Sequence, residues 1–221
     1  MPEPVSGYCG RIANKPLGAG LKMMRISVLV VMLCASAVQA AERQWQLERE
    51  EDGIRVYLAE VPGSKYKAYR GVVTVKSDLP RILAVQEDVT GSCAWIFSCQ
   101  QQRLLDTRGD VSEVYTRFEM PWPVKARDSV IQVTTRTDAD GSVTRLLRAV
   151  PDRLPEERDF VRVSRVDGEW HLKPLSQGEV EVTYEVHTEP GGSVPSWLAN
   201  SFVVDAPLET LKGLRAQAEG R

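Results

Sequence analysis

Apolar and polar residues alternate along most of the chain after residue 44, and a period of two is typical of half-buried β-strands. Short stretches rich in glycine, proline and aspartate separate the alternating segments, as in Glu51-Asp52-Gly53 and at Asp167-Gly168. The pattern predicts strands at residues 45–50, 54–61, 65–76, 103–106, 112–120, 127–138, 142–150, 161–166, 170–175 and 179–188. We expect 161–166 and 170–175 to pair across Asp167-Gly168.

Three stretches have helical spacing instead. Residues 78–88 place apolar residues three and four apart, with Ser77 or Asp78 as the N-cap and Pro80 in the first turn. A second short helix is predicted at 93–98, and a long one at 195–218. Pro207 lies inside the last helix and is expected to bend or restart it, with Asp205 as the cap of the second half.

The order of these elements predicts the fold class. Three strands, two short helices, a run of further strands and one long C-terminal helix indicate an α+β fold in which the helices are segregated from an antiparallel sheet. A long curved sheet that wraps around the terminal helix leaves room for a cavity between them.

The first 40 residues have the character of an export signal. Lys22 and Arg25 give a basic n-region, residues 26–37 form a short apolar run, and Val38-Gln39-Ala40 suits signal peptidase, so we predict cleavage after Ala40. Residues 1–21 have no periodicity, and we interpret them as the product of a start codon assigned too far upstream, with Met23 or Met24 as the alternative start. The predicted mature protein, residues 41–221, is therefore secreted across the inner membrane and periplasmic. The chain's formal net charge of -2 does not favour nucleic-acid binding.

Cys93 and Cys99 are the two cysteines that remain after this cleavage. An oxidising compartment favours a disulfide between them, and a bridge needs a bend because six residues of continuous helix would hold the two Cα atoms too far apart. The alternative is two buried thiols. No histidine lies nearby in the sequence, so no metal site is expected.

Several blocks resemble a known family. The turn Met120-Pro121-Trp122-Pro123-Val124 precedes Arg127-Asp128, Val161-Arg162-Val163 follows, and residues 189–200 lead into the last helix. In order and spacing, these blocks resemble a bacterial START domain, the steroidogenic acute regulatory protein-related lipid-transfer family, over roughly residues 45–215. The resemblance implies a helix-grip fold, in which a curved antiparallel sheet wraps the C-terminal helix and one lipid or other apolar molecule lies between them.

The resemblance also implies a gate and its residues. The loop at Met120 to Val124 and the helix at 195–218 correspond to the family's gate, and no catalysis or cofactor is implied. The chain departs from the family in lacking an N-terminal helix, and in having Val133 where animal members place a cavity arginine. The candidate gate and ligand-binding residues are Met120, Trp122, Val124, Val133, Trp197, Leu198, Phe202, Val204, Leu208 and Leu211.

The remaining polar candidates are given structural roles. Arg127 and Asp128 are adjacent on a strand and therefore point to opposite faces, so we expect ion-pair or turn contacts rather than ligand binding. His171 and His187 lack the neighbours that a metal site or general base needs. Trp122 is open to two interpretations, a buried plug or a contact with ligand or membrane.

Two other functions stay open on the sequence alone. An enzyme of the polyketide cyclase or aromatase type shares the helix-grip architecture but needs acid and base groups in the cavity. An envelope interaction module without a ligand is the other alternative. The favoured interpretation is a monomeric protein that binds a lipid without catalysis and contacts membranes transiently.

Overall fold

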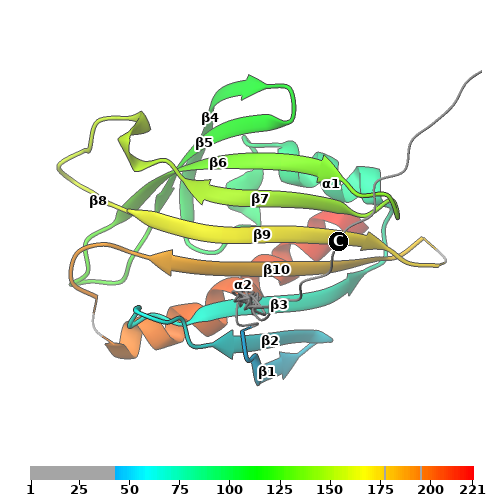
Figure 1. Ribbon diagram of the computed structural model, residues 1–221, viewed down its shortest axis with the longest axis horizontal. Coiled ribbons are helices and arrows are strands. Elements are labelled where there is room, and N and C mark those ends of the chain that lie inside the picture. Colours follow the sequence, from blue (N-terminus) through cyan, green and yellow to red (C-terminus); the bar gives the residue numbers. More distant parts are fainter. Residues whose placement is uncertain (1–42, 177, 195) are drawn as a thin grey trace, which may run out of the picture. The chain divides into compact units, whose positions relative to one another are not determined.

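The computed structural model describes residues 43–176, 178–194 and 196–221. Its described strands form one sheet in the order β1-β2-β3-β10-β9-β7-β6-β5-β4, with neighbours antiparallel, and β8 pairs in parallel with β6 (Figure 1). The bounds are β1 Gln46–Glu51, β2 Ile54–Ala59, β3 Ala68–Val75, β4 Cys99–Arg108, β5 Val111–Phe118, β6 Arg127–Thr137, β7 Val143–Ala149, β8 Val161–Arg162, β9 Arg165–Pro174 and β10 Val180–Glu189. The predicted α+β helix-grip fold is confirmed.

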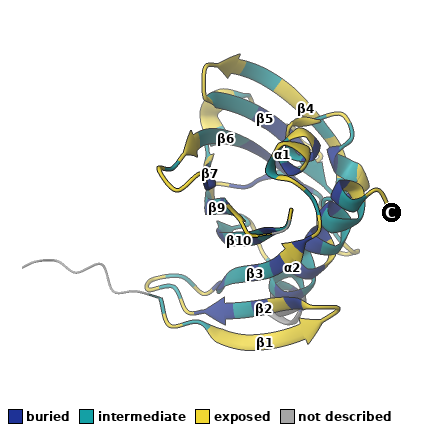
Figure 2. Ribbon diagram, turned by 90° about the vertical axis from the view of Figure 1, so that its right-hand side faces the viewer, coloured by how far each residue is buried: buried dark blue, intermediate teal, exposed yellow. Residues whose placement is uncertain are grey.

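The sheet curls, with helix α2 (Ser196–Glu219) on its concave side (Figure 2). Helix α2 packs on β2 and β3, where Leu208, Leu211 and Leu214 join the buried residues of the strands in one core. The outermost strand β1 is exposed along its whole length and carries mostly charged side chains, which protect a sheet edge from pairing with other chains. Among the described residues, no helix is long and apolar enough to cross a membrane.

Helix α1 (Leu79–Glu87) begins as predicted. The Asp78 side chain accepts a hydrogen bond from the Arg81 backbone N–H at 2.8 Å, and Pro80 lies in the first turn. Its buried residues Ile82 and Val85 pack into the main core.

The second short helix was predicted too long. It is a single 3-10 turn, η1 (Ser92–Ala94), because Cys93 and Cys99 form a disulfide with their Cα atoms 4.8 Å apart, which a continuous helix over 93–98 cannot allow. Ser98 takes a positive φ of 56° at this bend, and β4 starts at Cys99. The predicted bridge and its bend are confirmed.

The predicted turn at Asp167-Gly168 is wrong. Both residues lie inside β9, which is continuous from Arg165 to Pro174, and β8 is a separate two-residue strand. Gly168 is needed for close approach rather than for a turn, since a Cβ at this position would lie 2.7 Å from the Glu185 carbonyl oxygen. Glycine in a strand often marks such an approach of two backbones.

Of the two outcomes predicted at Pro207, a bend or a restart of the last helix, the restart is wrong. Helix α2 runs without interruption from Ser196 to Glu219, although proline removes one backbone hydrogen bond from a helix interior. Packing compensates on both sides of Pro207, where Val204, Leu208 and Leu211 are buried. Asp205 is not a helix cap, and its carboxylate instead pairs with Arg49 of β1 at 3.0 Å.

Candidate functional site: an apolar cavity

A cavity of about 660 Å³ lies between the sheet and the helices, within the 300 to 1,000 Å³ that is typical of sites for small ligands. Strands β3 to β7, β9 and β10 contribute its walls, together with α1, η1, α2 and several of the segments that connect these elements. Most of the lining is apolar, and it includes Val114, Ile131, Val133, Leu147, Trp170 and Val186. An apolar cavity of this size suits a hydrophobic molecule.

Helix α2 presents two different faces. One face lines the cavity, with Leu198, Ala199, Phe202, Val203, Ala206 and Thr210. The other face packs on the sheet and contains the predicted ligand residues Val204, Leu208 and Leu211, which do not line the cavity. The sequence pattern therefore identified the stripe that packs on the sheet. The cavity stripe is harder to find because Ala199, Ala206 and Thr210 are small or polar.

The other predicted gate residues are distributed between cavity and surface. Met120, Val133, Leu198 and Phe202 line the cavity, and the rings of Phe97 and Phe202 meet edge to face with their centroids 5.5 Å apart. The side chain of Trp197 lies outside the described part of the structure.

The loop between β5 and β6 has one side chain that lines the cavity and another that is exposed at the surface. Met120 reaches the cavity, whereas Trp122 is 91% exposed, so the buried-plug interpretation of Trp122 is excluded. Val124 does not line the cavity, and its backbone N–H closes a turn with the Pro121 carbonyl at 3.0 Å.

Arg127 and Asp128 lie on opposite faces of β6. Arg127 lines the cavity and donates to the carbonyl oxygens of Lys125 and Gly191, the second at 3.3 Å. Gly191 belongs to the segment between β10 and α2, so Arg127 fixes the approach to the helix. Burial lowers the pKa of the Arg127 guanidinium, and its Nε has no partner among the described residues.

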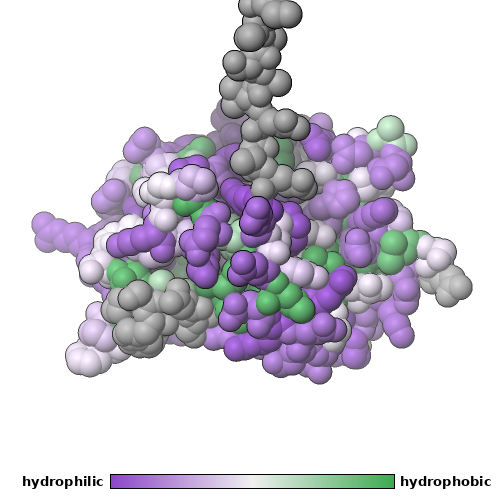
Figure 3. Space-filling view, turned by 60° about the horizontal axis from the view of Figure 1, so that its bottom comes forward, coloured by the Kyte–Doolittle hydropathy of each residue, from purple (hydrophilic) through white to green (hydrophobic). Residues whose placement is uncertain are grey.

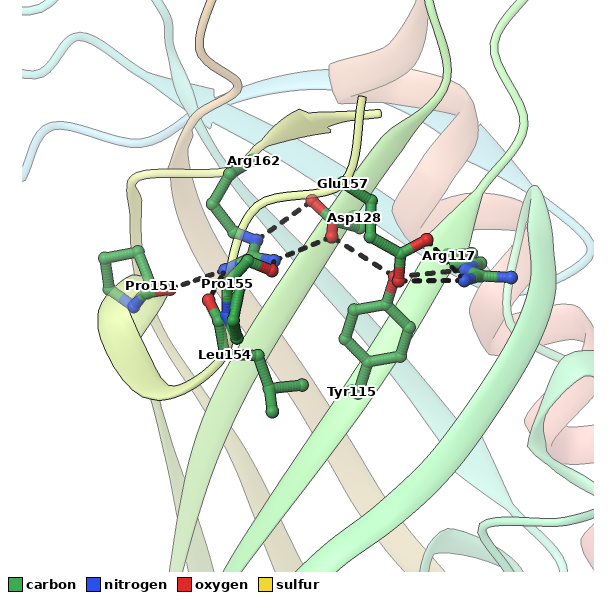
Figure 4. A network of polar contacts seen from close by, with 8 residues as sticks. All are labelled: Tyr115, Arg117, Asp128, Pro151, Leu154, Pro155, Glu157 and Arg162. Carbon is green, nitrogen blue, oxygen red and sulfur yellow. Dashed lines mark hydrogen bonds and ion pairs between the residues drawn. The ribbon is translucent and has the colours of Figure 1, made fainter. Parts of the chain in front are cut away.

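Asp128 is 1% exposed and forms a two-pronged ion pair with Arg162, both N–O distances being 2.9 Å (Figure 4). Arg162 also donates to the carbonyl oxygens of Pro151, Leu154 and Pro155. The bonds to Asp128 raise the pKa of Arg162. This pair therefore holds the loop between β7 and β8 against the outer face of β6.

Tyr115 extends the same network towards β5. Its hydroxyl lies 3.2 Å from Asp128 Oδ2 and 3.2 Å from Glu157 Oε1, and Arg117 binds Glu157 at 2.7 Å (Figure 4). Burial raises the pKa of the Tyr115 phenol. These residues stabilise the wall of the cavity from outside, since Tyr115, Glu157 and Arg117 do not line it.

Sequence reasoning missed a positive charge in the cavity. Arg145 of β7 lines the cavity, is 7% exposed and donates from Nη1 to Gln86 Oε1 of α1 at 3.0 Å. Val133 of β6 occupies the position where the family pattern has a cavity arginine, but the neighbouring strand β7 supplies Arg145 instead. Arg145 could have been found as the inward-facing position between Val143 and Leu147 in the period-two pattern.

Aromatic side chains surround another part of the cavity. Trp170 stacks on Tyr184 with ring centroids 3.8 Å apart, and the hydroxyls of Tyr69 and Tyr184 are 3.2 Å apart. Burial raises the pKa of both phenols, so they stay neutral over the physiological range. Trp95 is 7% exposed and belongs to the core, while also touching the cavity.

Neither histidine lines the cavity. His187 is completely buried, with Nε2 3.1 Å from the Ser64 hydroxyl, which itself donates to Glu189 at 2.5 Å. Burial lowers the pKa of His187. Within the described ranges, no three or more His, Cys, Asp and Glu side chains are grouped to hold a metal ion.

Comparison with known proteins decides the family. The family model described as START domain matches residues 14–219. The chain belongs to the START domain family. A START structure from Xanthomonas axonopodis, a STAR-related lipid transfer protein, is 38% identical, superposes with a TM-score of 0.75, and the match covers 79% of this chain and 98% of that one.

Two curated proteins are also similar to this START domain. An uncharacterised protein of Pseudomonas aeruginosa is 54% identical over 199 residues, which cover 90% of this chain and 98% of the relative. The phosphatidylcholine transfer protein of Bos taurus is 24% identical over 161 residues, 71% of this chain and 75% of the relative. Family membership suggests that this chain binds a lipid.

Proposed function

We propose that this START domain binds one lipid or other hydrophobic molecule in its cavity, reversibly and without catalysis, and transfers it. The observation that carries the proposal is the apolar cavity of about 660 Å³ between the sheet and α2. The relative from Xanthomonas axonopodis, a STAR-related lipid transfer protein, supports the assignment. Burial of the ligand's hydrocarbon surface stabilises the complex by roughly 25 cal/mol per Å² removed from water.

The proposed entrance lies between the β5–β6 loop and the first part of α2. Met120 of the loop and Phe202 of the helix both line the cavity, and Arg127 binds the segment that leads into the helix. In this proposal these elements separate to let the ligand pass and close again around it.

The proposed membrane contact is made by Trp122. This side chain is 91% exposed, next to the residues of the proposed entrance, and tryptophan favours the interface between lipid and water. The face on the side of β1 and β2 is less suited to membrane contact. It is mostly hydrophilic, and its hydrophobic residues form separate small groups (Figure 3).

We propose that the mature protein acts in the periplasm after cleavage at Ala40. The supporting observations are the signal-like residues 22–40 and the Cys93–Cys99 disulfide, since structural disulfides are typical of oxidising compartments. Fractionation of cells that express the full chain, with mass measurement of its N-terminus, tests the location. Intact protein in the cytoplasm would contradict it.

A matched pair of substitutions on β7 tests cavity binding. Leu147→Trp fills the cavity, whereas Arg148→Trp adds the same side chain to an exposed position on the same strand. Displacing roughly two methylene groups of ligand, at about 0.8 kcal/mol each, weakens binding of a fluorescent lipid about tenfold in Leu147→Trp. Arg148→Trp is expected to bind like the unaltered protein. Equal affinities of both variants would contradict binding in this cavity.

A further inference from the structure

Two adjacent side chains in the cavity have hydrogen-bond donors without acceptors. Arg145 Nε and Gln86 Nε2 are both buried and have no partner among the described residues, although Arg145 Nη1 binds Gln86 Oε1 at 3.0 Å. An arginine side chain is only a donor, and the single amide oxygen of Gln86 is already in use. The group that completes this site must therefore supply acceptor atoms.

The charge of Arg145 also lacks a counterion. No carboxylate of the described residues forms an ion pair with it, and burial lowers the pKa of its guanidinium. Glu87 also lines the cavity, and its charge acts against the lowering of the Arg145 pKa, but Glu87 is exposed and forms no ion pair with Arg145 among the described contacts. The contrast with Arg162 is direct, because Arg162 is equally buried but is bound by Asp128 and three carbonyl oxygens. An unpaired buried charge costs stability, so a purely structural role does not explain Arg145.

We propose that Arg145 and Gln86 bind the acidic head group of an amphipathic ligand, whose carboxylate or phosphate oxygens accept hydrogen bonds from both side chains. The inference rests on the proposed function of the cavity and names the class of ligand. Arginine binds such oxyanions through paired N–H groups, which makes the contact both strong and directional.

The register of the sheet gives the ligand a direction. Arg145 pairs with Thr135 of β6, eight residues from Arg127, which corresponds to about 26 Å along a strand. Arg127 donates from both Nη1 and Nη2 to carbonyl oxygens near the proposed entrance, which leaves only its Nε without a partner, whereas Arg145 donates from Nη1 alone. Arg145 is therefore the more available of the two cations for binding a ligand. The acidic head therefore lies inside the cavity beneath α1, and the hydrocarbon chain extends towards Met120 and Phe202.

Three ligands with the same chain length test the inference: palmitate, hexadecyl phosphate and hexadecanol, each used to displace a fluorescent lipid from the full protein. We expect at least one acid to bind more tightly than the alcohol, and the tighter acid identifies carboxylate or phosphate as the preferred head group. Arg145→Met is expected to weaken acid binding by about 10- to 100-fold and to change alcohol binding by less than about threefold. Arg136→Met, an exposed arginine on β6 outside the cavity, is the control and is expected to change neither.

Stability provides a second readout. Without ligand, Arg145→Met is expected to melt at the same or a higher temperature, because it removes an unpaired buried charge. Gln86→Glu adds an anion beside Arg145 and is expected to raise the melting temperature while weakening acid binding. A lower melting temperature of Arg145→Met, or equal affinities for acid and alcohol in the unaltered protein, would overturn the role of Arg145. Failure of all three ligands to bind would instead overturn the proposed function.

Discussion

Replacing Asp128 by alanine is expected to lower the free energy of unfolding by about 3 kcal/mol. Asp128 is 1% exposed and holds Arg162 through two hydrogen bonds of 2.9 Å. Removing one partner of a buried ion pair costs roughly 3 to 5 kcal/mol because the other charge stays buried without compensation. Arg162 keeps the carbonyl oxygens of Pro151, Leu154 and Pro155, which places the expected loss at the lower end of that range.

Thermal and urea unfolding followed by circular dichroism measure this loss. For a protein of this size, about 3 kcal/mol corresponds to a decrease in Tm of roughly 6 to 12 °C. The double variant Asp128→Ala/Arg162→Met removes both charges and is expected to be more stable than the sum of the two single changes predicts. Arg136→Met, which breaks an exposed ion pair, is the control and is expected to change stability by less than about 0.5 kcal/mol.

Two results would refute this reasoning. A loss below about 1 kcal/mol in Asp128→Ala would mean that the pair does not hold the β7–β8 loop against β6. Strict additivity of the two single changes would mean that Asp128 and Arg162 are not coupled.

Three further predictions concern the gate, the membrane and pH. A disulfide introduced between Met120→Cys and Phe202→Cys is expected to stop ligand exchange until it is reduced, and unchanged exchange would contradict the proposed entrance. Trp122→Ser is expected to reduce lipid transfer between vesicles while leaving binding of monomeric lipid unchanged; transfer at the normal rate would exclude this contact. Because burial lowers the pKa of His187 from its usual value of 6.5, the folded protein binds its proton less readily than the unfolded chain, so stability is complete above about pH 6.5 and decreases as pH falls below it. Urea unfolding from pH 7.5 to 5 is expected to show a smaller decrease for His187→Gln, and identical decreases would contradict this.

The sequence predicted correctly those elements whose conformation is set by residues close to one another in the chain. Alternating residues identified most of the strands, and Asp78 with Pro80 defined the start of α1. The spacing of Cys93 and Cys99 required a bend, and the structure has one at Ser98. In each case the residues that decide the conformation lie within a few positions of one another.

The predictions were wrong or incomplete where the conformation or role of a residue depends on residues far away in the sequence. Gly168 has the sequence of a turn, but the backbone of Glu185 lies against it across the sheet. Pro207 has the sequence of a helix break, but contacts of α2 with β2 and β3 keep the helix continuous. Arg145 is one charged residue on an apolar strand face, and its importance depends on Gln86, 59 positions away.

The cavity itself could be anticipated only as a consequence of the fold. Sequence periodicity cannot distinguish a helix that packs tightly against the sheet from one that leaves space beside it. In α2, one face packs tightly and the other leaves space. Leu208 and Leu211 fill the core against the sheet, whereas Ala199 and Ala206 are too small to fill the space beside them. The small residues of α2 thus help to create the volume that a ligand can occupy.

Native mass spectrometry of the purified protein, followed by extraction and identification of any bound molecule, tests the central claim most directly. We predict one hydrophobic molecule per protein chain, retained in the unaltered protein and largely lost from Leu147→Trp. A protein that is purified empty and takes up no lipid, sterol or fatty acid offered in excess would contradict the claim that this cavity is a lipid-binding site.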